Sequence, residues 1–219
     1  MKQKTFYLFL VVIFSLQSCH AQKNKNTHIK KTEKMNAITK NFETFDNNKY
    51  KELEKVNHLY QSEFLQDGTY IEMLKSNSGN VYRETPKESY FTITKGYYTN
   101  GNIHGKGLFF NLSWSGFQKG IWYEFDESGK LIKEIDYDKP YDFTFEDILK
   151  FCEREKIPLQ KGPILQSTGY HTVIKRDYNA HNSWWIIERL KQSDIIEVIT
   201  LDGDSGKILK RENREYINN

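Results

Sequence analysis

In this 219-residue chain, the side chains suited to catalysis or metal binding are the acidic, histidine and cysteine side chains. Residues 202–206 read Asp-Gly-Asp-Ser-Gly, and alternating acids of this kind begin calcium-binding loops. The later acids and the closing glutamate of such a loop are missing, so the favoured interpretation is a solvated β-turn. His171, Asp177 and His181 surround one predicted hairpin, but the extended strand from His171 to Asp177 spans about 20 Å, which is too long for one metal site.

Motifs for catalysis are missing from the sequence. It contains no glycine-rich phosphate loop, no HExxH, no CxxC and no nucleophile elbow. We therefore predict a protein that is not an enzyme and that uses no cofactor or metal. The competing hypothesis, a hydrolase with an unrecognised site, requires titratable side chains that cluster in a cleft.

Cys19 ends an N-terminal pattern that is typical of an export signal. Lys2 and Lys4 precede an unbroken apolar run over residues 6–14, and residues 15–18 are more polar. The apolar run makes about 14 Å of helix, roughly half of a 30 Å hydrocarbon core. A removable signal therefore explains it better than a permanent membrane span.

The sequence Leu16-Gln17-Ser18-Cys19 resembles the lipobox of bacterial lipoproteins. The resemblance implies that residues 1–18 are a signal peptide and that Cys19, as the first mature residue, is acylated through its sulfur. Two or three acyl chains would anchor the protein firmly, because each buried methylene contributes about 0.8 kcal/mol. An aspartate after the cysteine retains enteric lipoproteins at the inner membrane, so His20 favours the outer membrane, facing the periplasm or the surface. The alternative is an ordinary secretory signal beside an unpaired cysteine.

Cleavage before Cys19 also changes the charge of the chain. The formal net charge of +3 falls to +1 when Lys2 and Lys4 leave, so no case for nucleic-acid binding remains. Residues 19–34 hold five lysines, one glutamate and almost no large apolar side chains, which predicts a flexible tether. These lysines either lie against anionic lipid head groups or belong to a solvated spacer.

Cys152 is the other cysteine, and with Cys19 acylated it has no partner for an intramolecular disulfide. Thr144 and Asp147 form a predicted capping box, and the apolar residues after them recur at helical spacing as far as Cys152. We therefore predict a helix over residues 145–155, in which Cys152 is a small buried hydrophobic side chain and not a reactive thiol.

Three segments with different patterns follow the tether. Residues 35–66 are predicted to be helical, with an amphipathic helix over residues 49–64, although residues 64–70 could already belong to a strand. Residues 67–139 alternate aromatic-rich strands with glycine turns, and residues 140–219 combine the helix described above with an antiparallel sheet. The strands of that sheet are predicted at residues 170–178, 183–190, 195–201 and 207–212. The patterns predict an α+β fold, with an antiparallel sheet of β-hairpin repeats between an N-terminal helical segment and a C-terminal helix-plus-antiparallel-sheet region.

The segment over residues 67–139 repeats itself. Residues 79–84 align with residues 129–134, and residues 101–106 form a degenerate copy between them. Each copy predicts a strand, a tight turn with glycine at positive φ, and a return strand. Several such hairpins would make one continuous antiparallel sheet.

Two families share parts of this pattern. Residues 120–137 have the order of glycine, aromatic residues, serine-glycine turn, aliphatic residue and acid, and they resemble the variant MORN repeat of bacterial proteins. That resemblance implies a hairpin scaffold and not a reaction, and some members accompany toxin-antitoxin systems. The helix at Phe145 with residues 185–187 and 198–208 resembles the PepSY domain, which implies binding or inhibition of peptidases. Alternatively, residues 206–212 are one more hairpin repeat.

Aromatic residues make up 15% of the chain, which is more than usual, and most of their side chains must be packed against other groups. Adjacent rings such as Trp184 and Trp185 point to opposite faces of a strand, so one of each pair enters the core. The favoured interpretation of the others is packing within a two-layer domain. The alternative is a binding face for a protein or a glycan, with the candidate residues Trp114, Trp122, Tyr98 and Tyr123.

These features together predict a lipid-anchored cell-envelope protein that acts as a non-enzymatic binding or scaffold module. Its partners would be the membrane, through the lipid, and a protein or glycan of the envelope. The alternative function is an immunity, antitoxin-type or peptidase-inhibitor protein that neutralises a partner protein.

The lipid anchor is tested by Cys19→Ser, which removes the sulfur to which the lipid would be attached. We expect the variant to leave the membrane fraction or to accumulate as uncleaved precursor, as measured by detergent partitioning and by the mass of the chain. Cys152→Ala is the control and should stay on the membrane. Unchanged partitioning of Cys19→Ser would refute the anchor.

Overall fold

The computed structural model describes residues 38–56, 61–111, 116–165 and 169–216. The predicted signal peptide, the tether with Cys19, and Trp114 lie outside these ranges. The chain divides after Ala37, and the unit that begins at Ile38 contains all of the described residues. None of the described helices has the length and apolar character needed to cross a membrane.

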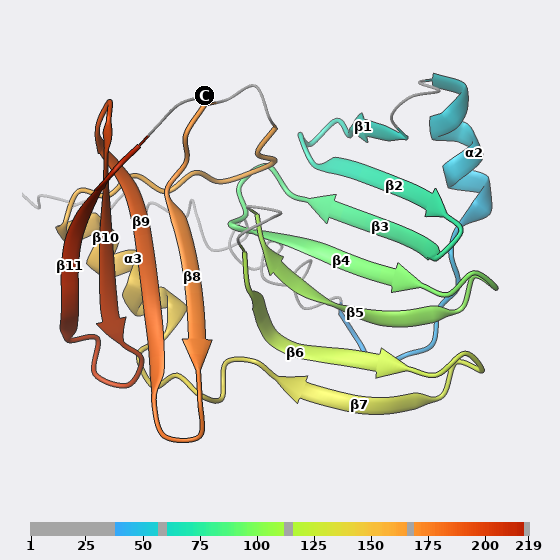
Figure 1. Cartoon of the computed structure of the whole chain (residues 1–219). Coiled ribbons are helices and arrows are strands. Elements are labelled where there is room, and N and C mark those ends of the chain that lie inside the picture. The colour runs from blue at the N-terminus through green and yellow to red at the C-terminus, as the bar shows by residue number, and fades with distance from the viewer. Residues whose placement is uncertain (1–37, 57–60, 112–115, 166–168, 217–219) are drawn as a thin grey trace, which may run out of the picture. The chain divides into compact units, whose positions relative to one another are not determined.

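Two antiparallel sheets and two helices make up the described part of the chain, which confirms the predicted α+β fold (Figure 1). The larger sheet is a series of hairpins, in which seven strands pair with their neighbours in chain order: β1 (Ser62–Phe64), β2 (Tyr70–Ser76), β3 (Gly79–Thr85), β4 (Phe91–Tyr97), β5 (Ile103–Phe110), β6 (Gln118–Phe125) and β7 (Leu131–Asp136). The smaller sheet has the order β11-β10-β9-β8 and consists of β8 (Val173–Tyr178), β9 (Ser183–Gln192), β10 (Ile195–Asp202) and β11 (Ile208–Glu215). The helices are α2 (Asn47–Val56) and α3 (Phe145–Arg154).

Glycine sets the tight turns at one end of the larger sheet. Gly79, Gly101 and Gly129 have φ values of 138°, 87° and 87°, in a region that residues with a Cβ atom rarely adopt. Each glycine stands at the turn between two paired strands, as the sequence repeat predicts. The predicted hairpin turns are therefore confirmed.

The predicted helical segment is helical only over α2, and the predictions for the stretches on either side of it are wrong. Residues 38–46, which we call the extended segment, contain no helix, and Thr44 forms a bridge with Asn102 at the turn between β4 and β5. The predicted helix over residues 49–64 ends early, because Ser62–Phe64 pairs with β2 as β1. In both places, backbone hydrogen bonds to strands that come later in the chain replace the helical ones.

The extended segment brings a carboxylate onto two lysines of the larger sheet. Glu43 accepts hydrogen bonds from Lys95 at 2.5 Å and from Lys106 at 2.6 Å, and Lys106 also donates to the Asn41 carbonyl at 2.6 Å. The Lys106 side chain is only 2% exposed, and its ammonium lies 5.4 Å from the centre of the Phe125 ring. Burial alone would raise the pKa of Glu43, but the hydrogen bonds and charges of both lysines hold that pKa below its usual value. These ion pairs fasten the extended segment to the sheet.

The extended segment and α2 supply part of the core of the larger sheet. Asp46 caps α2 by accepting hydrogen bonds from the backbone N–H groups of Asn48 and Lys49 at 3.0 and 2.9 Å. The helix then buries Leu53. The core cluster consists of Phe45, Leu53, Ile71, Met73, Tyr97, Ile103 and Phe125. It therefore combines side chains of the extended segment, of the helix and of the strands.

Helix α3 confirms the predicted helix and its capping box. The Thr144 hydroxyl accepts a hydrogen bond from the Asp147 N–H, and the Asp147 carboxylate accepts one from the Thr144 N–H. Cys152 is 1% exposed, and burial raises the pKa of its thiol to about 12. The thiol therefore stays protonated and packs as a small apolar group, as predicted.

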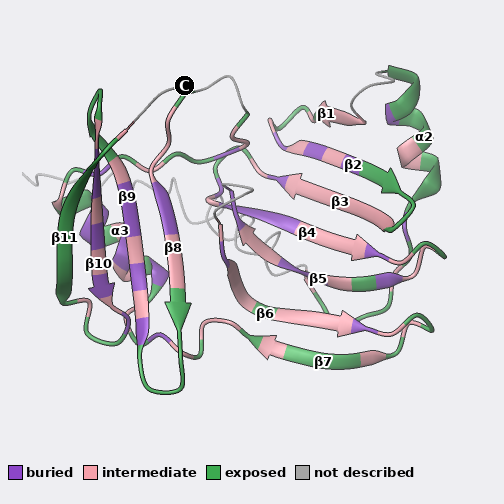
Figure 2. Ribbon diagram, in the orientation of Figure 1, coloured by how far each residue is buried: buried purple, intermediate pink, exposed green. Residues whose placement is uncertain are grey.

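The strands predicted in the C-terminal region match β8 to β11, with ends that differ by no more than three residues. β11 pairs with β10, so residues 208–212 belong to the smaller sheet. Buried side chains concentrate on α3, β9 and β10, whereas β11 is exposed along its whole length (Figure 2).

A cluster of aromatic side chains joins the larger sheet, α3 and the smaller sheet. The ring of Phe145 on α3 packs against Phe91 of β4, with 4.9 Å between ring centres. The ring of Phe117, just before β6, packs against Trp185 of β9 at 5.3 Å. Trp185 is fully buried and donates its indole N–H to the Phe143 carbonyl at 2.8 Å. The two sheets therefore share one apolar junction.

Arg176 of β8 lies within this junction, and its side chain is only 5% exposed. Its guanidinium lies 4.7 to 5.5 Å from the centres of three rings, those of Phe117, Tyr141 and Trp185. It donates hydrogen bonds to Asp138 at 2.7 Å and to the Gln118 carbonyl. Burial alone would raise the pKa of Asp138, but hydrogen bonds from Lys119 and Arg176 lower that pKa, so the carboxylate is ionised at neutral pH.

We expect Arg176→Met to lower the free energy of unfolding by about 2–4 kcal/mol, because it takes away a buried partner of Asp138 and the cation between three rings. Urea-induced unfolding, followed by tryptophan fluorescence, measures the change. The control is Arg83→Met, whose ion pair with Glu72 is partly exposed and should contribute less than about 1 kcal/mol. Equal losses in the two variants would show that Arg176 does not stabilise the junction.

Candidate functional site

The described members of the predicted aromatic face do not lie on one surface. Trp122 packs against Gly107, where an added Cβ atom would come within 2.2 Å of the indole ring. Its indole N–H donates to the Leu108 carbonyl at 3.0 Å. Tyr123, the next residue of β6, points to the opposite face and packs against the core cluster that includes Phe125.

Tyr98 stands in the turn between β4 and β5. Its hydroxyl donates to the Phe125 carbonyl at 2.8 Å, and its ring packs edge-on against His104 with 4.8 Å between ring centres. Trp114 lies outside the described residues. The three described rings therefore make contacts within the fold, and Trp122 and Tyr123 lie on opposite faces of β6.

The residues that the sequence offers as candidate metal ligands also lie apart. Asp202 accepts hydrogen bonds from the Ser205 hydroxyl at 2.6 Å and N–H at 2.8 Å, which lower the pKa of Asp202 and confirm the predicted β-turn. Asp177 lies in β8, whereas His171 precedes that strand and His181 lies in the turn after it. In the ranges that the structure describes, no three His, Cys, Asp or Glu side chains group as metal ligands.

A hollow of about 370 Å³ lies beside the turn between β8 and β9. It is lined by Lys139, Pro140, Tyr178, Asn179, Ala180, His181, Asn182, Ser183 and Asp204. The Asn179 side chain accepts hydrogen bonds from the N–H groups of His181 and Asn182 at 2.9 and 3.0 Å, and Ser183 donates to Asp204 at 3.3 Å. The side chains of Asn179, Ser183 and Asp204 are thus used in hydrogen bonds to other residues of this lining.

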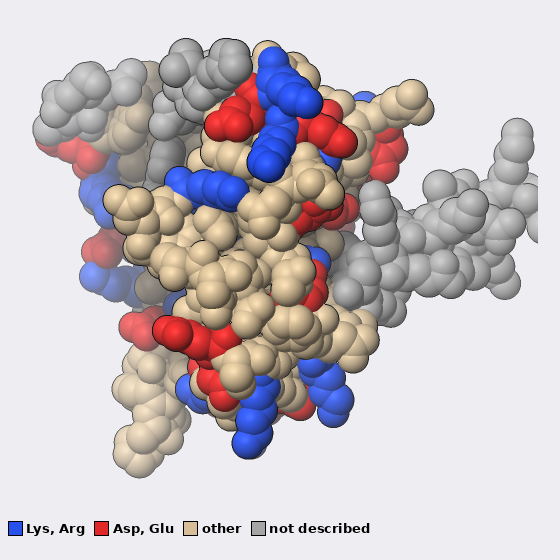
Figure 3. All heavy atoms as spheres, turned by 90° about the vertical axis from the view of Figure 1, so that its right-hand side faces the viewer, with Lys and Arg blue, Asp and Glu red and all other residues tan. Residues whose placement is uncertain are grey.

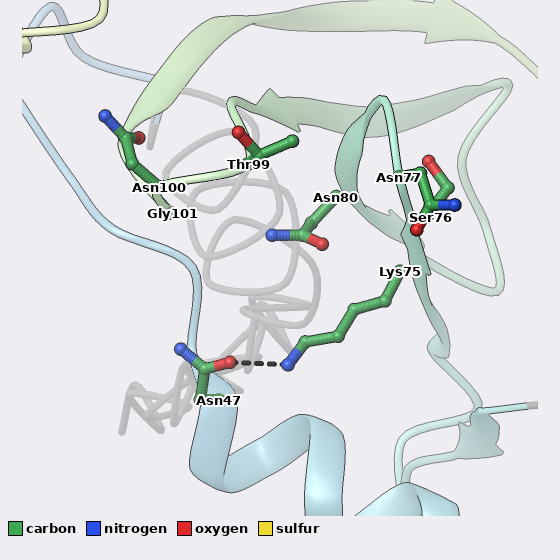
Figure 4. A pocket seen from close by; sticks show the side chains of 8 residues that line it. All are labelled: Asn47, Lys75, Ser76, Asn77, Asn80, Thr99, Asn100 and Gly101. Atoms are coloured by element: carbon green, nitrogen blue, oxygen red, sulfur yellow. Dashed lines mark hydrogen bonds between the residues drawn. The ribbon is translucent and has the colours of Figure 1, made fainter.

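The stronger candidate site is a polar pocket of about 340 Å³ at the glycine-turn end of the larger sheet. The turns at this end and α2 belong to the face shown in Figure 3, where charged side chains of both signs lie near the margins and the middle is largely uncharged. The pocket is lined by carboxamides, hydroxyls and one ammonium, from Asn47, Lys75, Ser76, Asn77, Asn80, Thr99, Asn100 and Gly101 (Figure 4). We call this set the turn-end pocket.

Two hairpin turns and the start of α2 position these side chains. The turn at Gly79 places Lys75 of β2 directly opposite Asn80 of β3. The turn between β4 and β5 holds Thr99 and Asn100, and Asn100 is fixed by donating to the Glu127 carbonyl at 3.1 Å. A hydrogen bond to the turn between β6 and β7 therefore holds the Asn100 side of the pocket in place.

Three polar side chains of the turn-end pocket keep their hydrogen-bonding capacity. Within the described part of the chain, the side chains of Asn77, Asn80 and Thr99 form no hydrogen bond. In Figure 4 the Asn80 carboxamide extends into the space between the two turns and Asn47. A carboxamide offers two donors and an oxygen acceptor, and a hydroxyl offers one donor and two lone pairs. The pocket can therefore both donate to a ligand and accept from it.

Lys75 is the charged member of the turn-end pocket. Its ammonium donates to the Asn47 carboxamide oxygen at 2.7 Å and lies 5.6 and 4.7 Å from the ring centres of Phe45 and Tyr50. No carboxylate pairs with Lys75 among the described residues. The site thus holds a positioned cation without an anionic partner.

The chemistry available in this pocket is binding. Carboxamide and aliphatic hydroxyl groups do not ionise near neutral pH, so they are poor general acids and bases. A lysine alone provides neither a nucleophile with its base nor an acid-base pair. The sequence contained a signal for the site, because Asn80 follows a turn glycine and Asn100 precedes another. Asparagine beside glycine is so common in turns that this signal indicates only a turn.

Comparison with family models, with curated proteins and with solved structures gave no match. The resemblances to the lipobox, the MORN repeat and the PepSY domain stay predictions. The function is therefore argued from the turn-end pocket and from the N-terminal sequence.

Two glycines beside the pocket give a matched test of its architecture. In Gly101→Ala the only cost is that of a positive φ, because no atom lies within 4 Å of the added Cβ. We expect the free energy of unfolding to fall by about 1 kcal/mol. Gly79→Ala has the same cost and also places its Cβ 2.4 Å from the Tyr97 carbonyl oxygen. We expect the free energy of unfolding to fall by about 3 kcal/mol. Chemical denaturation of both variants measures the difference, and a smaller loss for Gly79→Ala would contradict this account of the turn.

Proposed function

We propose that this chain is a lipid-anchored, non-enzymatic binding protein of the cell envelope, and that the turn-end pocket is its binding site. The observation that carries the proposal is that Asn77, Asn80 and Thr99, whose side chains form no hydrogen bond within the described part of the chain, line the same pocket as Lys75, which has no carboxylate partner there. A small number of polar groups placed along one pocket is the usual means by which a site fixes the orientation of a ligand.

The N-terminal sequence supports the location in this proposal. The lipobox-like residues Leu16-Gln17-Ser18-Cys19 favour acylation of Cys19, and the lysine-rich residues 19–34 favour a tether between the lipid and the folded unit. His20 favours the outer membrane. A binding protein held in this way meets ligands of the envelope at a high effective concentration.

The pocket is built to be stable, which also supports binding as its role. Its residues stand on β2, on β3, at the first residue of α2 and in two hairpin turns, and the turn between β4 and β5 is tied to the turn between β6 and β7 by the Asn100 and Asn102 side chains, which donate to the Glu127 carbonyl at 3.1 and 2.8 Å. A site on such elements loses little conformational entropy when a ligand binds.

The proposal is tested by capture of envelope components on the full chain in detergent. The wild type should retain a glycan or protein component that the double variant Asn80→Leu, Thr99→Val does not retain. The control variant carries Asn213→Leu and Thr200→Val on the smaller sheet and should retain the component as the wild type does.

Three outcomes contradict the proposal. The wild type retains nothing, the pocket variant retains as much as the wild type, or the captured component is converted to a product. Protection of cells from a co-expressed toxin or peptidase, unchanged in the pocket variant, would favour the alternative function as an immunity or inhibitor protein.

A further inference from the structure

We propose that the turn-end pocket takes an acidic saccharide, with the carboxylate of the sugar on Lys75 and its ring hydroxyls on Asn77, Asn80 and Thr99. This inference rests on the proposed function and adds the chemical class of the ligand. Charge, hydrogen-bonding pattern and size each point to this class.

The charge of the pocket favours an anion. Lys75 is the sole ionised side chain among the eight described residues that line the pocket. An ammonium has three donors, of which one is used by the Asn47 oxygen at 2.7 Å. The rings of Phe45 and Tyr50 hold the ammonium in place, so a ligand carboxylate meets a positioned cation with free donors.

The hydrogen-bonding pattern favours adjacent hydroxyl groups. Asn77 and Asn80 each present a donor and an acceptor on one planar group, and Thr99 adds a hydroxyl. Neighbouring hydroxyls of a sugar ring can donate to the amide oxygen and accept from the amide nitrogen at once. A bare anion such as acetate or phosphate could accept from Lys75 and from the donors of these side chains, but it would leave the two amide oxygens without a donor.

The size and lining of the pocket exclude other ligand classes. A volume of about 340 Å³ lies at the lower end of the range for small-molecule sites. No large apolar side chain lines the pocket, so an apolar ligand would gain little from burial there. A single lysine also neutralises too little charge for a nucleic-acid backbone.

The test is a calorimetric titration of the full chain in detergent with glucuronic acid and with galacturonic acid, each measured separately. Glucose and acetate are the matched probes, because each carries one half of the proposed recognition. We expect at least one uronic acid to bind about tenfold or more tightly than glucose and acetate do. Lys75→Met removes the ammonium and keeps an unbranched side chain, and it should weaken uronic acid binding about tenfold or more.

Asn80→Leu should weaken binding to a similar extent, because it removes both partners of a hydroxyl pair. The control is Lys51→Met, which removes an exposed lysine of α2 outside the pocket lining and should leave binding unchanged.

Several results would overturn the inference. They are no binding of either uronic acid, binding of acetate as tight as that of the uronic acids, or uronic acid binding that Lys75→Met does not weaken. Glucose binding as tight as uronic acid binding, lost in Asn80→Leu, would overturn the acidic class and leave the proposed function standing. Failure of the proposed function is recognised separately, since it requires that the pocket variants capture envelope components as the wild type does.

Discussion

The buried guanidinium of Arg176 is the constraint that unites the described fold. It comes from β8, yet its partners are Asp138 after β7, the Gln118 carbonyl of β6 and rings on both sides of the junction. An arginine in such surroundings needs a paired carboxylate, because a buried charge without a partner is costly. The packing of the smaller sheet therefore depends on residues at the end of the larger sheet. The two sheets stabilise each other and are not independent modules.

A second polar tie governs the opposite end of the larger sheet. Lys106 is buried directly opposite Lys95 of β4, and it is tolerated because Glu43 and the Asn41 carbonyl reach it from the extended segment. The same segment continues through Phe45 into α2, and Phe45 and Asn47 are the residues that hold Lys75 in the turn-end pocket. The pocket thus depends on an ion pair that is not part of its lining. The position of Lys75 and the packing of the extended segment are consequently coupled.

How much of the fold could be predicted depends on whether local sequence or distant partners decide each element. The turns at Gly79, Gly101 and Gly129 were predictable because positive φ is a local demand on residue type. Helix α3 was predictable because Thr144 and Asp147 form its cap within four residues. Residues 38–46 were not, since their apolar spacing fits a helix while hydrogen bonds to Gly101 and Ile103 make them extended. Whether these residues become helical or extended is therefore decided only when the strands of the sheet are present to bind them.

The candidate site escaped prediction for a related physical reason. Surplus aromatic residues suggested a binding face, yet rings such as Trp122 and Tyr98 are used by the sheet, against Gly107 and the Phe125 carbonyl. Asparagines beside turn glycines carried no such suggestion, because a turn alone accounts for them. Turn residues have a freedom that strand residues lack: they can change without altering register or core, as long as the glycine keeps its φ. In a sheet of repeated hairpins, the row of turns at one edge is therefore the place where open polar groups can gather at least cost to the fold.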